Sequence, residues 1–214
     1  MKTSNYPYRL LMLALLSMSV PAVCAENEDA ADMHSHHHHM MMQTKYQTVE
    51  YKLPQIRLVR EDGASVSFAE ELNDGRPVVM NFIYTTCTTI CPLASHTFAE
   101  LQDKLGSERD TVHMVSVSID PEQDTPPVLA QYAKKYGADK QWQFYTGTKD
   151  ASIAAQMAFN VYLGDKTNSN PVTFLRAAPD KPWLRIDGFA KSDELLRLLR
   201  DVEKYGEVRQ PADE

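Results

Sequence analysis

Long apolar runs, basic charge and cysteine are all scarce in this sequence of 214 residues. Its apolar run at residues 10–20 has about eleven residues, whereas a membrane-spanning helix needs roughly 20. Lys and Arg number 22 against 29 Asp and Glu, so the net charge of -7 disfavours nucleic acid or an anionic membrane as the main partner. The sequence shows no Ser-His-Asp arrangement, no phosphate loop and no paired-carboxylate site. These absences direct attention to the three cysteines.

The N-terminus predicts export. Lys2 and Arg9 precede the apolar run, and Val23 and Ala25 fit the small-residue pattern of a cleavage site, so residues 1–25 are interpreted as a signal peptide. An uncleaved anchor is the alternative, and it would leave the protein membrane-anchored and facing the periplasm. Cys24 is expected to leave with the signal, because the three residues before it do not suit a lipid attachment site. The mature chain of about 189 residues then has 20 basic and 29 acidic side chains and room for one domain.

Export places Cys87 and Cys91 where disulfides persist, for example in a bacterial periplasm. The pair can therefore be oxidised, reduced or metallated. We expect a monomer that meets a membrane only through its partner or through an uncleaved N-terminus.

A segment rich in histidine and methionine follows the signal. Residues 26–48 show no apolar periodicity and are predicted to be a disordered tail. Imidazole and thioether together suit copper better than calcium or magnesium. A purification tag or a chance run is the alternative interpretation. The candidate copper ligands are Met33, His34, His36, His37, His38, His39, Met40, Met41 and Met42.

The rest of the chain predicts an α/β domain over residues 49–206, followed by a C-terminal tail at 207–214. Two alternating runs around residues 61–63 indicate a hairpin, and the continuous apolar run at 77–84 is typical of a central strand buried on both faces. A helix over 92–106 and a strand over 111–120 follow. Two further helices, with a short strand between them, precede a strand pair and a closing helix. This order predicts a thioredoxin-like fold, a central mixed sheet flanked by helices with an N-terminal β-hairpin.

Cys87 and Cys91 lie between the predicted central strand and the helix near Pro92. Side chains four residues apart on a helix lie about 5–6 Å apart at Cβ, so the two sulfurs can meet. The helix N-terminus stabilises a thiolate, which is both a nucleophile and a soft metal ligand. An inert disulfide staple is disfavoured because its loop would be very small. The two sulfurs are expected to lie side by side at an accessible rim, and Cys87, expected to be the more exposed, is predicted to attack first.

Three stretches resemble the Sco (SenC) family of thioredoxin-fold copper proteins that serve cytochrome c oxidase assembly. They are "YTTCTTICP" at 84–92, "SVSIDPEQDTPPVLAQYAKKYG" at 116–137 and "TGTKDASIAAQMAFNVY" at 146–162. The resemblance spans about residues 50–200. It implies that Cys87 and Cys91 bind a copper ion and that the same dithiol exchanges with a partner's cysteines. It also implies a copper-enzyme subunit, or another copper or thiol protein, as the partner.

The chain departs from the family at one ligand. Family members place a copper-binding histidine shortly before the strand after the third helix, where this chain has Ser169 or Asn170, and no histidine follows His113. Two thiolates can hold Cu(I), whereas Cu(II) would require the missing imidazole. We expect His96 to face solvent or pack, and His113 to be a hydrogen-bonded core residue.

The tail is the remaining source of ligands. About 10–15 of its residues outside the fold would reach on the order of 20 Å, at an effective concentration near millimolar. We hypothesise that its histidines and methionines complete or feed the dithiol site.

Pro171 is a further site candidate. The stretch "NPVTFL" resembles the proline-containing segment of thioredoxin-like oxidoreductases in which a cis proline sits opposite the cysteines. Pro171 is therefore hypothesised to be cis and to face Cys87, since a cis X-Pro bond costs only about 0.5–1 kcal/mol. An ordinary trans proline at the start of a strand is the alternative. Asp124 is interpreted as a helix cap, and Asp120 as a turn residue that could orient groups near the site.

Three functions compete. The first is an exported Sco-like protein that handles copper or electrons during assembly of a copper enzyme such as cytochrome c oxidase. The second is a periplasmic thiol-disulfide oxidoreductase with no intrinsic copper role. The third, a peroxiredoxin-like peroxidase, is disfavoured because such enzymes use one attacking cysteine and a distant resolving one.

Overall fold

The computed structural model describes residues 44–168 and 170–205. The predicted signal peptide, the His/Met ligands at 33–42 and the C-terminal tail at 207–214 lie outside these residues. The strands of the described part are β1 (Lys45–Val49), β2 (Arg57–Arg60), β3 (Ser65–Ser67), β4 (Val78–Ile83), β5 (His113–Ser118), β6 (Trp142–Thr146), β7 (Val172–Arg176) and β8 (Trp183–Asp187). The α-helices are α1 (Phe68–Leu72), α2 (Ile90–Leu105), α3 (Pro126–Lys135), α4 (Lys149–Ala158) and α5 (Ser192–Tyr205), and two short 3-10 helices are η4 (Gly106–Thr111) and η5 (Lys166–Asn168).

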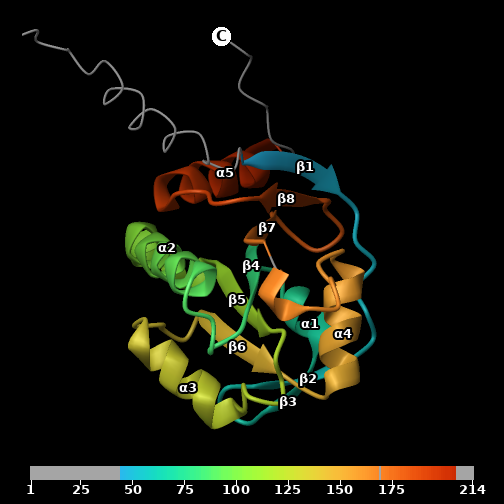
Figure 1. The fold of residues 1–214 in the computed structure, drawn as a ribbon. Helices are drawn as coiled ribbons and strands as arrows, with labels where there is room; N and C mark the ends of the chain where they lie inside the picture. Colours follow the sequence, from blue (N-terminus) through green and yellow to red (C-terminus); the bar gives the residue numbers. More distant parts are fainter. Residues whose placement is uncertain (1–43, 169, 206–214) are drawn as a thin grey trace, which may run out of the picture. The chain divides into compact units, whose positions relative to one another are not determined.

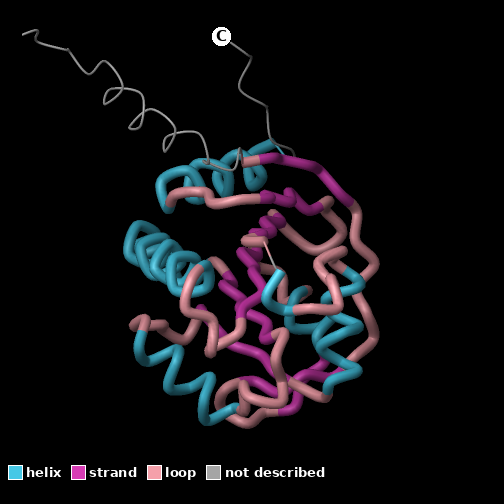
Figure 2. Tube along the Cα trace, in the orientation of Figure 1, coloured by secondary structure: helices cyan, strands magenta, loops and turns pink. Residues whose placement is uncertain are grey.

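All of these strands join one mixed sheet in the order β1-β8-β7-β4-β5-β6-β2-β3. Strands β4, β5 and β6 are parallel, and the other pairings are antiparallel. Helices α2, α3 and α5 cover one face, and α1 and α4 cover the other (Figure 1). The strands run through the middle of the domain between these two helical layers (Figure 2). This is the predicted thioredoxin-like fold, with the β2–β3 hairpin at one edge of the sheet.

Strand β4 lies at the centre of the sheet, between β5 and β7. Its continuous apolar sequence is explained by helices on both faces, because successive side chains of a strand point to opposite sides. Val79 and Ile83 belong to the core layer that includes α2 and α5, whereas Val78 and Met80 belong to the layer that includes α4. The chain after Ile83 therefore leaves the sheet at the carboxyl ends of the parallel strands, and helix α2 begins there.

The folded part begins earlier than the sequence predicts. Residues 45–48 were assigned to the disordered tail, but Lys45–Val49 forms β1 and pairs with β8. Only Tyr46 and Val49 of this strand are even half-buried, so its five residues carry little apolar alternation. Pairing with β8, which is distant in sequence, is what orders it. The five-residue helix α1, capped by the Ser67 hydroxyl, is also absent from the prediction. None of the helices within 44–168 and 170–205 is long and apolar enough to span a membrane.

Candidate functional site

The two cysteines lie at the junction between β4 and α2. Cys87 lies in the connecting loop, where its N–H donates to the Tyr84 carbonyl at 3.2 Å. Cys91 lies in the first turn of α2, as predicted. Thr89, the N-cap residue of α2, makes no side-chain capping hydrogen bond. Instead, the Cys91 N–H donates to Cys87 Sγ at 3.4 Å. The Cys87 sulfur thus occupies the place of the usual capping oxygen, where the helix dipole favours negative charge.

Hydrogen bonds make Cys87 the acidic thiol of the pair. Burial by itself would raise the pKa of Cys87, but the N–H groups of Cys91 and Thr89 and the side chains of both residues bond to the sulfur and lower the pKa to about 6. Burial raises the pKa of Cys91 to about 12; a hydrogen bond from the Tyr84 backbone opposes this rise, while Cys87 and Asp124 add to it. Near neutral pH the pair is therefore a Cys87 thiolate beside a Cys91 thiol. Both cysteines are free.

Both sulfurs are more deeply placed than the sequence predicts. The prediction of an exposed rim is wrong, because Cys87 is 7% exposed and Cys91 4%. The Cys87 sulfur accepts from the Cys91 N–H at the start of α2, and Tyr84 contributes a hydroxyl that hydrogen-bonds to Cys87. Burial and then this bond raise the pKa of Tyr84 to about 12, so Tyr84 remains a proton donor to the Cys87 sulfur.

A buried carboxylate fixes the cysteine loop to the neighbouring strand. Asp124 has no exposed surface, and both of its oxygens lie 3.2 Å from the Thr85 N–H. The Thr85 hydroxyl donates to Asp124 at 2.5 Å, and the Ser118 hydroxyl donates to it at 2.6 Å. The predicted role of Asp124 as the cap of α3 is therefore wrong, since Thr125 is the N-cap residue. Asp124 instead joins the "SIDPEQDTP" segment to the cysteine loop.

A second link comes from the segment before β7. Lys166 in η5 forms an ion pair with Asp120 at 2.5 Å, and its ammonium lies 5.6 Å from the centre of the Tyr84 ring. Asp120 thus orients the Lys166 side chain beside the cysteine site, the role that the sequence analysis considered for it. Sequence reasoning missed Lys166, because nothing local marks a lysine whose partners lie far away in the chain.

Pro171 lies on the wall of a cavity beside Cys91. The cavity has a volume of about 140 Å³, and its wall includes Cys91, Asn170 and Pro171. Every peptide bond among the described residues is trans, so the cis hypothesis for Pro171 is wrong. Val172 opens β7 immediately afterwards, so Pro171 is the trans proline before a strand that the alternative interpretation proposed. Ser169 lies outside the described residues.

The two histidines of the domain are occupied elsewhere. His96 is exposed and meets the Tyr136 ring edge-on at 5.1 Å between centroids. His113 is 1% exposed, with Nε2 2.9 Å from Gln143 and Nδ1 3.2 Å from Asp74. Both predictions are confirmed. Within residues 44–168 and 170–205, no group of three or more His, Cys, Asp or Glu side chains is placed to hold a metal ion. A metal bound by this site would thus have the two cysteines as its only ligands of these types in the described domain.

The fold and the site together define a thioredoxin-like protein with a helix-capping dithiol. A profile of the SCO1/SenC family matches residues 43–174, and the chain belongs to this family. An "SCO1 protein homolog" of Bacillus subtilis is 34% identical over 106 residues, which is 49% of this chain and 54% of the relative. A "putative copper-binding protein" of Stutzerimonas stutzeri is 33% identical over 90 residues, covering 42% of this chain and 43% of the relative. The chain thus spans about half the length of these curated relatives.

A solved structure agrees with the family assignment. The structure of BsSco, described as a member of the Sco family of cytochrome c oxidase assembly proteins that contains a disulfide switch, matches with a TM-score of 0.61. The sequences are 26% identical, and the match covers 74% of this chain and 97% of BsSco.

Proposed function

We propose that this protein is an exported copper-handling member of its family, and that Cys87 and Cys91 hold Cu(I) as cargo for a copper enzyme under assembly. The observation that carries the proposal is the bond from the Cys91 N–H to the Cys87 sulfur at the start of α2. This geometry provides a preformed thiolate, the soft donor that Cu(I) prefers. Family membership and a relative named as copper-binding support the choice of metal.

The ligand set favours the monovalent ion. Two thiolates satisfy Cu(I), which accepts low coordination numbers, whereas Cu(II) would need imidazole or carboxylate donors, and the described residues bring no such third ligand to the pair. The histidines and methionines of residues 33–42 are the remaining source of further ligands, because His96 and His113 have other partners. We propose that they collect copper and pass it to the dithiol.

A second function rests on the unequal acidity of the two thiols. The Cys87 thiolate would attack a sulfur of a target disulfide, forming a mixed disulfide and releasing one target thiolate. Cys91 would then lose its proton and attack Cys87 Sγ, releasing the second target thiolate and leaving a Cys87–Cys91 disulfide. Two electrons pass to the target. The lowered pKa of Cys87 and the disulfide switch named for BsSco favour this reaction.

The partner would be a copper-carrying subunit of an enzyme such as cytochrome c oxidase, and the compartment would be the periplasm. BsSco is described as a member of a family that assembles that oxidase. The protein would act there as a monomer, with no nucleic-acid role.

Titration with Cu(I) separates the two functions. The reduced protein, purified without an added tag, is titrated beside a Cys87→Ser/Cys91→Ser variant against a chromophoric Cu(I) chelator. Sub-micromolar binding that disappears in the variant is the expected result. Absence of tight binding in the unaltered protein, together with efficient reduction of a disulfide substrate, would favour the oxidoreductase. A variant lacking residues 26–42 tests the tail, because unchanged copper stoichiometry and delivery would remove its proposed role.

A further inference from the structure

The cavity beside Cys91 is large enough for one apolar side chain. Its volume is about 140 Å³, and its wall includes Ala94 and Phe98 of α2 together with Cys91. An engineered protein cavity of about 150 Å³ lined by apolar side chains binds benzene. A group no larger than benzene therefore fits here, which admits the side chain of a leucine, an isoleucine or a methionine.

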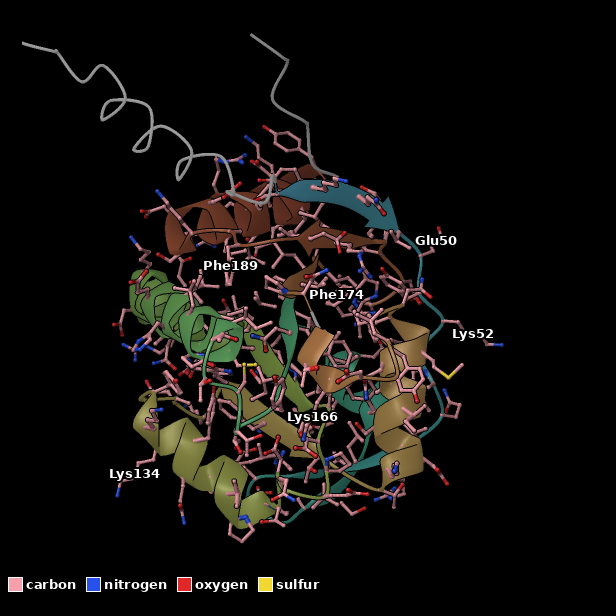
Figure 3. The ribbon with its side chains drawn as sticks, viewed as in Figure 1. Glu50, Lys52, Lys134, Lys166, Phe174 and Phe189 are labelled. Atoms are coloured by element: carbon pink, nitrogen blue, oxygen red, sulfur yellow. The ribbon has the colours of Figure 1, made fainter. Side chains whose placement is uncertain are left out.

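The mouth of the cavity carries exposed apolar side chains. Leu163 is 59% exposed and Phe189 is 38% exposed, and both belong to the wall. Leu163 follows α4 in the chain, whereas Phe189 lies between β8 and α2 in Figure 3. Single apolar side chains scattered over a surface are ordinary, but apolar side chains gathered around a cavity are typical of a binding site. The open side of the cavity is therefore a candidate contact surface.

The wall offers no uncompensated charge. Among its described residues, only Arg185 and Asp187 carry charged side chains, and they pair with each other at 2.8 Å between Nη2 and Oδ1. The Arg185 Nη1 also donates to the Phe159 carbonyl at 2.8 Å. A charged group that entered the cavity would lose its water without gaining a counter-ion of its own. The occupant that suits this cavity is therefore uncharged.

The cavity is continuous with the dithiol. Cys91 belongs to its wall, and the Cys87 sulfur lies 3.4 Å from the Cys91 nitrogen. Under either proposed function, a cysteine sulfur of the target has to reach this pair to take copper or electrons. Consecutive Cα atoms are 3.8 Å apart, so the residues next to that cysteine in the target chain come within reach of the cavity. The target segment that carries the cysteine is therefore the natural source of the occupant.

We propose that this cavity, with Leu163 and Phe189 at its mouth, docks one uncharged apolar side chain that lies within three residues of the reactive cysteine of the target polypeptide. The inference rests on the proposed function and specifies its partner, a cysteine-containing segment that also carries leucine, isoleucine or methionine. Burial of one such side chain strengthens a complex about ten- to a hundredfold. The contact thus orients the target without trapping it.

Tethering of peptides to Cys87 tests the docking site without copper. In Cys91→Ser, the mixed disulfide of Cys87 with 2-mercaptoethanol is made from bis(2-hydroxyethyl) disulfide and equilibrated with a short peptide that has one cysteine among alanines. The peptide thiol displaces 2-mercaptoethanol, so one disulfide forms as another breaks and no electrons are gained or lost. Mass spectrometry of the proteolytic fragment that contains Cys87 gives the exchange constant.

The peptide series varies one position at a time within three residues of the cysteine. Leucine in place of alanine is expected to raise the exchange constant about tenfold or more at one of these positions, because three more carbon atoms are buried. Aspartate at that position is expected to give no gain. Equal gains from leucine and aspartate, or no gain from leucine at any position, would overturn the inference.

Variants of the cavity mouth provide the matched comparison. Leu163→Ala and Phe189→Ala, combined with Cys91→Ser, are each expected to reduce the leucine gain by about threefold or more. Met157→Ala is the control, because Met157 is 61% exposed and is not among the described residues of the wall. Ala94→Leu fills part of the cavity and is expected to abolish the gain. An unaltered gain in both mouth variants, or an equal loss in Met157→Ala, would overturn the assignment.

Two combined outcomes separate this inference from the proposed function. If Cys87→Ser/Cys91→Ser keeps full Cu(I) affinity while the leucine peptide is favoured, the docking site stands and the copper function fails. If that variant loses Cu(I) affinity while no leucine position is favoured, only the docking inference fails. A dimer of the reduced protein in analytical ultracentrifugation that disappears in Phe189→Ala would assign the cavity mouth to a second copy of the chain, which would also overturn the inference.

Discussion

Replacement of Asp124 by alanine tests the buried link beneath the cysteine loop. The carboxylate has no exposed surface and accepts hydrogen bonds from the Thr85 N–H, the Thr85 hydroxyl and the Ser118 hydroxyl. A buried donor left without its acceptor costs roughly 1–3 kcal/mol. The two hydroxyls can rotate to other acceptors, but the Thr85 N–H cannot. We therefore expect Asp124→Ala to lower the free energy of unfolding by about 3 kcal/mol.

Asp120→Ala is the matched control. Asp120 is another acidic residue of the same segment; its side chain is 9% exposed, but that of its partner Lys166 is 40% exposed. Solvent screens such a pair, and exposed ion pairs contribute about 0–1 kcal/mol. Urea unfolding followed by circular dichroism measures both variants. For a domain of this size, 3 kcal/mol corresponds to a fall in Tm of roughly 6–12 °C. A loss below about 1 kcal/mol for Asp124→Ala, or equal losses in the two variants, would refute the reasoning.

Three further predictions concern the thiols. The rate of Cys87 alkylation is expected to reach half its maximum near pH 6, because the thiolate is the reactive form and hydrogen bonding lowers the pKa of Cys87 to about 6. Mass spectrometry measures this rate, and a midpoint above pH 8 would contradict the prediction. In Cys87→Ser, the remaining Cys91 is expected to react slowly below pH 9, because burial raises its pKa to about 12, and rapid labelling at pH 7 would count against this. Free Cu(I) at 100 times its Kd is expected to raise the free energy of unfolding by about 2.7 kcal/mol, and a chelator should reverse this gain. An equal gain in Cys87→Ser/Cys91→Ser would show that copper binds at another site.

Patterns that lie within one element predicted most of the fold. The continuous apolar run gave the buried strand β4, and Gly106, which adopts a φ of 55°, ends α2 where the sequence placed its stop. The β2–β3 hairpin followed from two alternating runs around residues 61–63. Such signals are local because the period of a strand or helix depends on the few residues that compose it.

Features created by distant partners escaped prediction. Asp124 was interpreted as a helix cap because it precedes Thr125-Pro126-Pro127, but its partner Thr85 lies 39 residues away and offers two donors. Strand β1 has little apolar alternation and is ordered by β8. The burial of the cysteines was missed for the same reason, because Cys87 and Cys91 belong to a core cluster whose other members come largely from elements distant in the sequence. The proximity of Cys87 to Cys91 was predicted, because it depends only on where helix α2 begins relative to the two cysteines.

The central claim is that the two cysteine sulfurs bind Cu(I) together. X-ray absorption at the copper edge, recorded on the reduced Cu(I)-loaded protein and on Cys87→Ser/Cys91→Ser, counts the sulfur neighbours of the metal directly. The account predicts a sulfur-dominated shell that loses two sulfur neighbours in the variant, or a variant that no longer retains copper. A nitrogen-dominated shell that is identical in the two proteins would contradict it.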